Sequence, residues 1–125
     1  MTPLLAKMRL KDAMAGFISG RPQPIVGLAG IPDGPVAGAS YDFGVLFVDS
    51  IGDLAKHWPA FQRALPGDQA MWICYPKTSS KVDTDISRDR GWEIVTSAGY
   101  QPVAQVAVDA TWSAVRFRKG EHIER

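Results

Sequence analysis

The fold is decided by one apolar run, Phe43-Gly44-Val45-Leu46-Phe47-Val48. The run has the length of a β-strand and shows no alternation of polar and apolar residues, which indicates that both faces of the strand are covered. Strands of this kind lie inside parallel sheets that carry helices on their faces. The run therefore predicts an α/β fold with this segment as a central parallel strand.

A helix is predicted directly after this strand. Ser50 followed by Asp53 has the spacing of a helix N-cap and an acidic residue three positions later. Apolar residues then recur at helical spacing, namely Leu54, Trp58, Phe61 and Leu65. Pro59 removes one intrahelical hydrogen-bond donor, so a kink or a break is expected after Trp58.

Further elements are expected C-terminal to this helix. A second apolar strand covers residues 69–75, and the strand, helix, strand order predicts a right-handed parallel crossover. Thr84 predicts the cap of a helix over residues 85–98. Residues 103–108 and 112–118 predict two strands with a tight connection, which form an antiparallel hairpin at the edge of the sheet.

The chain of 125 residues is expected to form one domain over residues 1–125. Residues 1–40 are irregular and rich in proline and glycine, with one strand near residues 12–19 and a short helix or strand over residues 25–29. The predicted fold class is α/β, with a mostly parallel sheet of about five strands, an antiparallel C-terminal hairpin and helices on the faces. Such a sheet is similar to a truncated Rossmann-like or methyltransferase-like fold.

Composition excludes several classes of partner. Apolar residues make up 46% of the chain and charged residues 22%, as in ordinary globular domains. The formal net charge of +1 gives no general attraction to nucleic acid or to anionic lipid, and no segment has the length that crosses a bilayer. The single Cys74 lies in an apolar run and suits a reducing compartment. We therefore expect a cytoplasmic protein without a nucleic-acid or membrane partner.

Polar residues follow the predicted strands where a ligand site is expected. In open parallel sheets ligands bind beyond the carboxyl ends of the strands, and the segments after the three predicted strands meet there. Lysines supply positive charge, short hydroxyls lie near a predicted helix start, an arginine could reach back as an anion clamp, and one tryptophan lies beside the hairpin. The candidate residues are Asp49, Lys77, Ser80, Lys81, Thr84, Arg88, Asp109 and Trp112.

A structural role also explains the same residues, and we place it ahead of the ligand site. Lys77 could pair with Asp49 or Asp109, and the hydroxyls could cap turns in a loop that merely connects two elements. Arg88 could pair with Asp85 one helical turn earlier. The sequence leaves both interpretations open.

The sequence lacks the residue patterns that several kinds of site require. His57 and His122 are the only histidines, and neither belongs to a pattern with zinc-ligand spacing or to a Ser-His-Asp or Cys-His arrangement. The glycine-rich motifs that hold dinucleotides and nucleoside triphosphates are missing. We therefore predict no metal, no cofactor and no catalytic residue.

The order and spacing of certain residues resemble a family of small bacterial proteins, DUF3052, that has no assigned reaction. The similar residues lie between residues 41 and 118 and comprise Tyr75-Pro76-Lys77, Ser80-Lys81, Thr84-Asp85, Arg88-Asp89, Asp109, Thr111-Trp112-Ser113 and Arg116-Phe117. The resemblance implies a shortened methyltransferase-like sheet with a closing antiparallel strand. The glycine-rich turn that would hold S-adenosylmethionine is not visible in this sequence.

Three functions remain in consideration. The first is a non-catalytic binding or interaction module, with a small anionic ligand or a protein as partner. The second is a reduced S-adenosylmethionine-dependent methyltransferase-like enzyme, with Asp49 or Asp109 on the acceptor side. The third is a structural subunit of a homo-oligomer, with the C-terminal edge strand or the first third of the chain at the interface.

Overall fold

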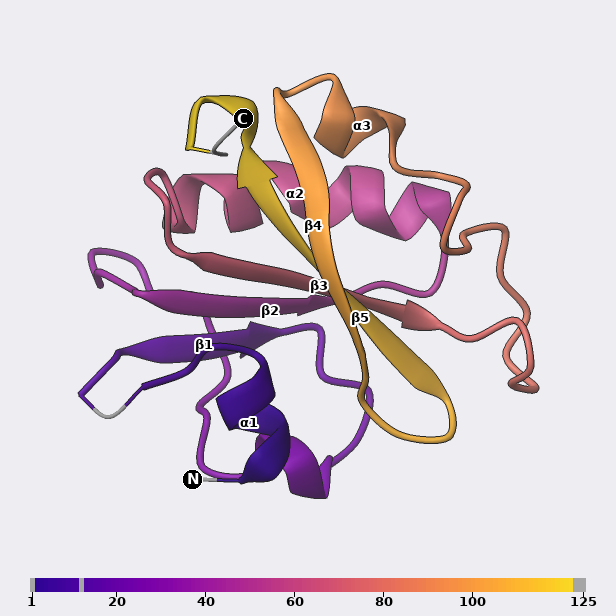
Figure 1. The fold of residues 1–125 in the computed structure, drawn as a ribbon, viewed down its shortest axis with the longest axis horizontal. Helices are drawn as coiled ribbons and strands as arrows, with labels where there is room; N and C mark the ends of the chain where they lie inside the picture. The colour runs from indigo at the N-terminus through magenta and orange to yellow at the C-terminus, as the bar shows by residue number, and fades with distance from the viewer. Residues whose placement is uncertain (1, 12, 123–125) are drawn as a thin grey trace.

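The computed structural model describes residues 2–11 and 13–122 and contains one five-stranded sheet (Figure 1). Its order is β1-β2-β3-β5-β4. The strands are β1 (Gly16–Ser19), β2 (Phe43–Phe47), β3 (Ala70–Pro76), β4 (Tyr100–Ala107) and β5 (Trp112–Lys119). The helices are α1 (Pro3–Lys7), α2 (Ile51–Ala64) and α3 (Glu93–Thr96), with 3-10 turns η1 (Val26–Leu28) and η2 (Gly120–His122).

The sheet is mixed, which corrects the prediction of a mostly parallel one. β1 pairs with β2 and β2 with β3 in parallel, whereas β5 pairs antiparallel with both β3 and β4. The predicted antiparallel hairpin exists, but its second strand lies inside the sheet and its first strand, β4, forms the edge. Residues of β5 are buried on both faces, while β4 exposes residues 101–105 and contains Pro102. Because proline cannot donate to a neighbouring strand, β4 suits the edge.

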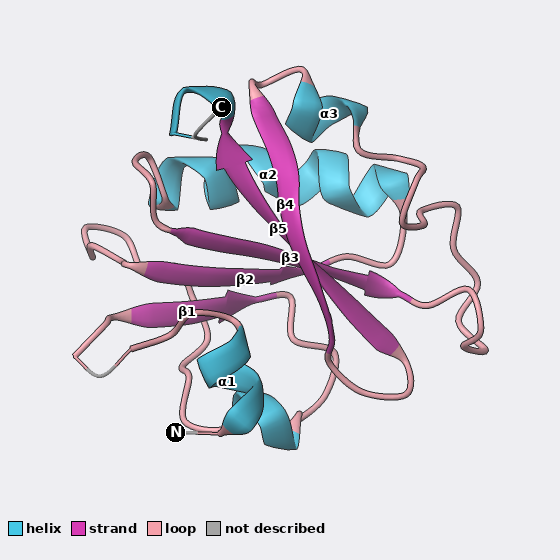
Figure 2. Ribbon diagram, viewed as in Figure 1, coloured by secondary structure: helices cyan, strands magenta, loops and turns pink. Residues whose placement is uncertain are grey.

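Helix α2 follows its sequence signals at the start but not at Pro59. The Ser50 hydroxyl accepts a hydrogen bond from the Asp53 N–H at 3.0 Å, as predicted for the N-cap. The helix then continues through Pro59 to Ala64 without the break that was one of the two expectations (Figure 2). Both Pro59 and Ala55, whose carbonyl loses its helical donor, are solvent-exposed. Water can therefore bond to this carbonyl, which lowers the cost of the proline.

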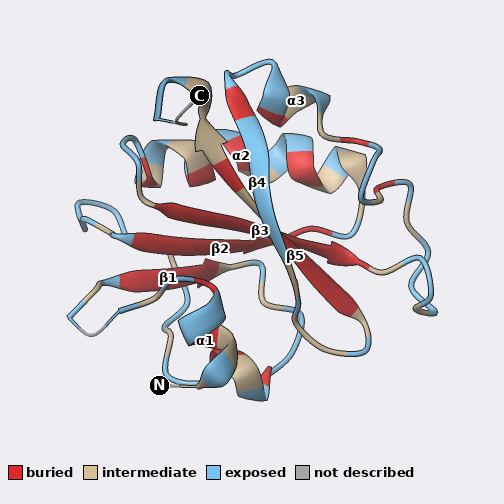
Figure 3. Cartoon of the chain, viewed as in Figure 1, coloured by how far each residue is buried: buried red, intermediate tan, exposed pale blue. Residues whose placement is uncertain are grey.

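The two faces of the sheet bury separate apolar clusters, so that the inner strands are almost wholly buried (Figure 3). Side chains at alternate positions of β3 divide between them. Ile73 and Tyr75 pack toward α2 and α3, whereas Trp72 and Cys74 pack toward α1 and η1. Trp58 and Trp72 are core residues as predicted, and burial raises the pKa of the Cys74 thiol, which makes it an inert core group.

A buried hydrogen bond anchors the segment after α1 to the sheet, in addition to the pairing of β1 with β2. The indole N–H of Trp72 donates to the carbonyl of Met8 at 2.8 Å, directly after α1. The strand predicted near residues 12–19 is present as β1, although Asp12 lies outside the described residues. The short element expected over residues 25–29 is the turn η1.

The helix predicted over residues 85–98 is wrong in its first half. Only α3 is helical, and residues 77–92 form an irregular loop. The Thr84 hydroxyl accepts from the Ile86 N–H at 3.1 Å and so holds a turn instead of starting a helix. Gly91 has a φ of 102° and packs against Ile51, which interrupts any helix running through it. Hydrogen bonds between short polar side chains and the nearby backbone thus stabilise a non-helical conformation in this segment.

None of the helices in the described part of the chain has the length and the apolar content that a membrane crossing requires.

Candidate functional site

The carboxyl edge of the sheet brings Lys77 and Asp109 together, but as parts of one structural network. The ammonium of Lys77 donates to the backbone carbonyl of Asp109 at 2.6 Å. The Asp109 carboxylate accepts from the N–H groups of Thr111 and Trp112, both at 2.8 Å, and thereby closes the β4–β5 turn. Lys77 therefore contacts Asp109 as the structural interpretation predicted, although through the carbonyl and not through the carboxylate.

Two other candidates, Asp49 and Trp112, contribute no side chain to this network. Asp49 is exposed, and its N–H donates to the Asp53 carboxylate at 3.1 Å. Trp112 is 6% exposed, and its ring packs edge-on against Phe47 with a centroid distance of 5.1 Å. Trp112 thus belongs to the core and leaves little surface for stacking on a ligand.

The hydroxyls of the loop after β3 support turns. Ser80 donates to the Lys77 carbonyl at 2.7 Å, and Thr84 accepts from the Ile86 N–H. Together with Lys81, these residues border a hollow of about 610 Å³ within the loop itself. Lys81 is exposed and makes no ion pair with any residue that the structure describes.

The N-terminus of α2, where an anion could bind at this edge, already holds a carboxylate. Asp85 accepts from the Ile51 N–H at 2.8 Å, across the gap between the loop and the helix. The Ser50 hydroxyl satisfies a second N–H of the first turn. Because carboxylates and hydroxyls occupy these donors, the helix end has little capacity left for a ligand.

A polar cavity of about 390 Å³ opens beside this network, on the face that carries α2 and α3. The Gln105 amide nitrogen donates to the Tyr75 hydroxyl at 2.8 Å and to the Ser113 hydroxyl at 3.3 Å. Lys77 and Arg88 also line the cavity. Two of the eight predicted residues, Lys77 and Arg88, therefore line this cavity together with residues outside the eight, among them Tyr75, Gln105 and Ser113.

Strand pairing brings the residues of this cavity together, and only some of them could be predicted from the sequence. Ser113 lies opposite Tyr75 in the β3–β5 register, and Gln105 lies opposite Val115 in the β4–β5 register. All three side chains consequently emerge on one face. The signal in the sequence was a glutamine and a serine in two apolar strands, but their proximity depends on β5 lying between β3 and β4.

The Tyr75 hydroxyl is a neutral donor at physiological pH. Burial raises its pKa above the usual value of 10.0, against the smaller lowering effects of hydrogen bonds from Ser113 and Gln105 and of the charge on Arg88. Gln105 donates to this hydroxyl and Ser113 is a second hydrogen-bond partner, so the Tyr75 proton can be directed to Ser113 or to a group in the cavity. The indole N–H of Trp92 donates to the Ser87 and Arg88 carbonyls at 2.8 and 3.2 Å, which fixes the Arg88 backbone at the rim.

The described part of the chain contains no group of three or more His, Cys, Asp or Glu residues that could hold a metal ion. No family model, no curated protein and no solved structure matches this chain. The resemblance to DUF3052 therefore remains a prediction, and functional conclusions rest on the geometry described above.

Proposed function

We propose that this protein is a non-catalytic binding module that takes a small ligand with an anionic group, such as a carboxylate, into the carboxyl-edge cavity. The observation that carries the proposal is the Tyr75 hydroxyl. Gln105 donates to it, so the hydroxyl keeps its own proton for donation, and an acceptor on a ligand can take that hydrogen bond in place of Ser113. Arg88 supplies a positive charge at the same cavity and is close enough to affect the Tyr75 pKa.

The site contains binding groups but no pair that performs acid–base or nucleophilic chemistry. Its lining has no histidine and no cysteine, its one carboxylate is that of Asp89, and the hydroxyl of Tyr75 stays protonated at neutral pH. Lys77 is engaged by the Asp109 carbonyl. Hydrogen-bond donors without an activated nucleophile favour binding over catalysis.

A thermal-shift screen tests this proposal with mono- and dicarboxylates, nucleotides, coenzyme A and S-adenosylhomocysteine. A ligand at one hundred times its dissociation constant adds about 2.7 kcal/mol of stability. We expect a carboxylate to raise the melting temperature of the wild-type protein, and Tyr75→Phe and Arg88→Gln to remove that shift. Arg63→Gln, at an exposed arginine outside this cavity, is the matched control. A carboxylate shift that survives in both cavity variants would place the ligand elsewhere.

A reduced methyltransferase-like enzyme is the second candidate. It is favoured by the last strand, β5, which runs antiparallel to β3 as the resemblance implies for the closing strand. Against it, Asp109 is committed to its turn. A saturable shift with S-adenosylhomocysteine would support this candidate, and no shift at millimolar concentration would end it.

The homo-oligomer is supported by an exposed edge strand, since residues 101–105 of β4 face solvent. The same strand carries Pro102 and a register shift between Pro102 and Ala104, features that hinder pairing with another strand. A monomer in light scattering across a concentration series would exclude this third function. A cytoplasmic location belongs to the proposal as well, supported by a single buried thiol.

A further inference from the structure

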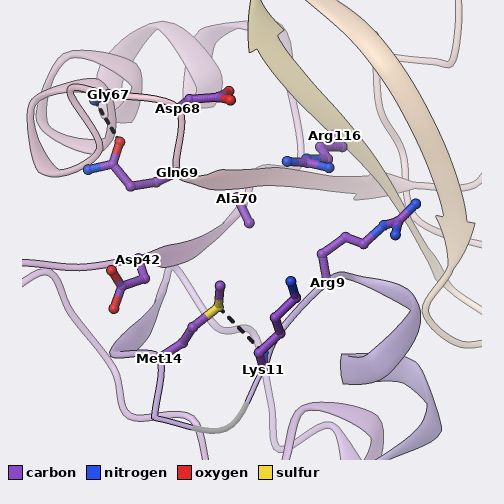
Figure 4. A pocket seen from close by; sticks show the side chains of 9 residues that line it. All are labelled: Arg9, Lys11, Met14, Asp42, Gly67, Asp68, Gln69, Ala70 and Arg116. Carbon is purple, nitrogen blue, oxygen red and sulfur yellow. Dashed lines mark hydrogen bonds between the residues drawn. The ribbon is translucent and has the colours of Figure 1, made fainter. Parts of the chain in front are cut away.

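We propose a second ligand site at the opposite edge of the sheet, where Arg9, Lys11 and Arg116 bind a phosphate group. The site does not depend on the carboxyl-edge cavity. It surrounds a cavity of about 520 Å³ at the amino ends of β2 and β3 (Figure 4). Arg9 and Lys11 reach up from the segment after α1, and Arg116 comes from β5.

Arg116 provides the central observation. Its Nε atom is buried and has no hydrogen-bond partner among the residues that the structure describes. Burial lowers the pKa of this guanidinium, and the nearby charges of Arg118 and Arg9 lower it further, against an opposing effect of Asp68. A guanidinium stays charged in proteins, so an unsatisfied donor here is a cost that an anion would remove.

The carboxylates around this cavity are engaged by other groups. Asp68 forms an ion pair with Arg118, with Nε–Oδ1 and Nη2–Oδ2 distances of 3.0 and 2.5 Å. Asp42 accepts from the Ala15 N–H at 2.9 Å and lies across the cavity from Arg9 (Figure 4). Neither one pairs with Arg116.

The three cations themselves have no ion-pair partner among the residues that the structure describes. Asp68 is neutralised by Arg118, so the remaining charged groups of the lining are these three cations and Asp42. The cavity therefore carries an excess of positive charge, although the net charge of the whole chain is +1. This excess favours a multiply charged anion over a singly charged one.

The fold positions the backbone of two of the three cations, Arg116 and Arg9. Arg116 lies opposite Trp72 in the β3–β5 register, and the Trp72 indole holds the Met8 carbonyl, next to Arg9. Arg9 adopts a left-handed φ of 72° just after the C-cap of α1, where glycine is the usual residue. An arginine therefore occupies a position whose backbone conformation disfavours residues with a Cβ atom.

A phosphate group matches the charge of this lining. It carries up to two negative charges near neutral pH and offers several acceptor oxygens to donors that approach from different elements. Two guanidinium groups and one ammonium suit it better than a planar carboxylate. The ligand is free phosphate or the phosphomonoester of a small molecule, since the cavity is large enough for an organic group as well.

Calorimetric titration with inorganic phosphate, glycerol 3-phosphate and acetate at constant ionic strength tests this site. We expect saturable binding of both phosphates at one site and none of acetate. Tighter binding of glycerol 3-phosphate than of inorganic phosphate would identify the phosphomonoester as the ligand, and the reverse order would identify the free ion. Absence of saturable phosphate binding would overturn the proposal.

Variants separate this site from the carboxyl edge. Arg116→Gln and Arg9→Gly should each weaken phosphate binding more than tenfold, whereas the control Arg63→Gln should bind as the wild type does. Because Arg116 has no partner for Nε, Arg116→Gln should melt no earlier than the wild type without phosphate. Unchanged binding in both cavity variants, or loss in Arg88→Gln with retention in Arg116→Gln, would contradict the proposal. The latter result would place phosphate at the carboxyl edge, where a carboxylate screen tests the other site separately.

Discussion

The two edges of the sheet each carry a cavity, and they differ in how their charged groups are satisfied. At the carboxyl edge Lys77 donates to a backbone carbonyl and Asp85 caps α2, so most polar groups there hold the fold together. At the amino edge Arg9 and Arg116 lack ion-pair partners among the described residues, and Arg116 has a buried unpaired Nε. A local concentration of polar residues in sequence thus indicates structural bonding as readily as a ligand site.

The largest effect is expected at the buried contact that anchors the segment after α1 to the sheet. Trp72→Phe removes the donor to the Met8 carbonyl and leaves space in a fully packed core. We expect a loss of about 2–3 kcal/mol in the free energy of unfolding, measured by urea denaturation. Phosphate binding should weaken too, because Arg9 loses its anchor. Trp58→Phe, equally buried on the other face, is the control and should leave phosphate binding intact.

The same substitution at two lysines compares the edges directly. Lys77→Met breaks the partly buried bond to the Asp109 carbonyl and should cost about 1–2 kcal/mol. Lys11→Met, at an exposed side chain, should change stability by less than about 0.5 kcal/mol while weakening phosphate binding. Urea denaturation and calorimetry measure the two quantities. Equal stability of the two variants would show that the Lys77 bond contributes nothing.

A smaller gain in stability is expected from Arg9→Gly. Glycine adopts the left-handed backbone of this position without a Cβ penalty, so the change should stabilise the folded protein by about 0.5–1 kcal/mol. Phosphate binding should fall at the same time. A stabilised variant that also loses binding is difficult to attribute to misfolding. A destabilised one would indicate that the arginine side chain makes structural contacts.

The smallest expected effect is on the stability of the protein at acidic pH. The Arg118 hydrogen bonds lower the pKa of Asp68 below its ordinary value of 3.8. A carboxyl whose pKa is lower in the folded state stabilises the protein above its unfolded pKa, and that contribution disappears as the pH falls through the folded value. Asp68→Asn should therefore show a shallower loss of stability below pH 3.8 than the wild type, as measured by thermal melts. Identical slopes would mean that solvent screens this exposed pair completely.

Much of the parallel half of the sheet could be predicted from the sequence. The apolar runs of β2 and β3 and the capped helix α2 are local signals, and the structure has them within two residues of the expected ends. The hairpin was also local, but its placement was not. β5 lies inside the sheet because residues on both of its faces are buried, whereas most residues of β4 are exposed.

The sites were harder to predict because they depend on pairing. Arg116 alternates with Val115 and Phe117, so the sequence marks it as a residue on the opposite face of β5 from them. Its proximity to Arg9 follows from β5 pairing with β3 and from the Trp72 contact with Met8. Tyr75, Gln105 and Ser113 likewise meet only through strand order. Of the predicted residues, Lys77 and Arg88 line the carboxyl-edge cavity.

Amide chemical shifts recorded during a phosphate titration test the difference between the edges most directly, because both cavities are observed in one experiment. The account predicts saturable shifts at Arg9, Lys11, Arg116 and residues 67–70, with little change in the loop of residues 77–91. Shifts confined to that loop, or the absence of saturable shifts at the amino edge, would contradict it.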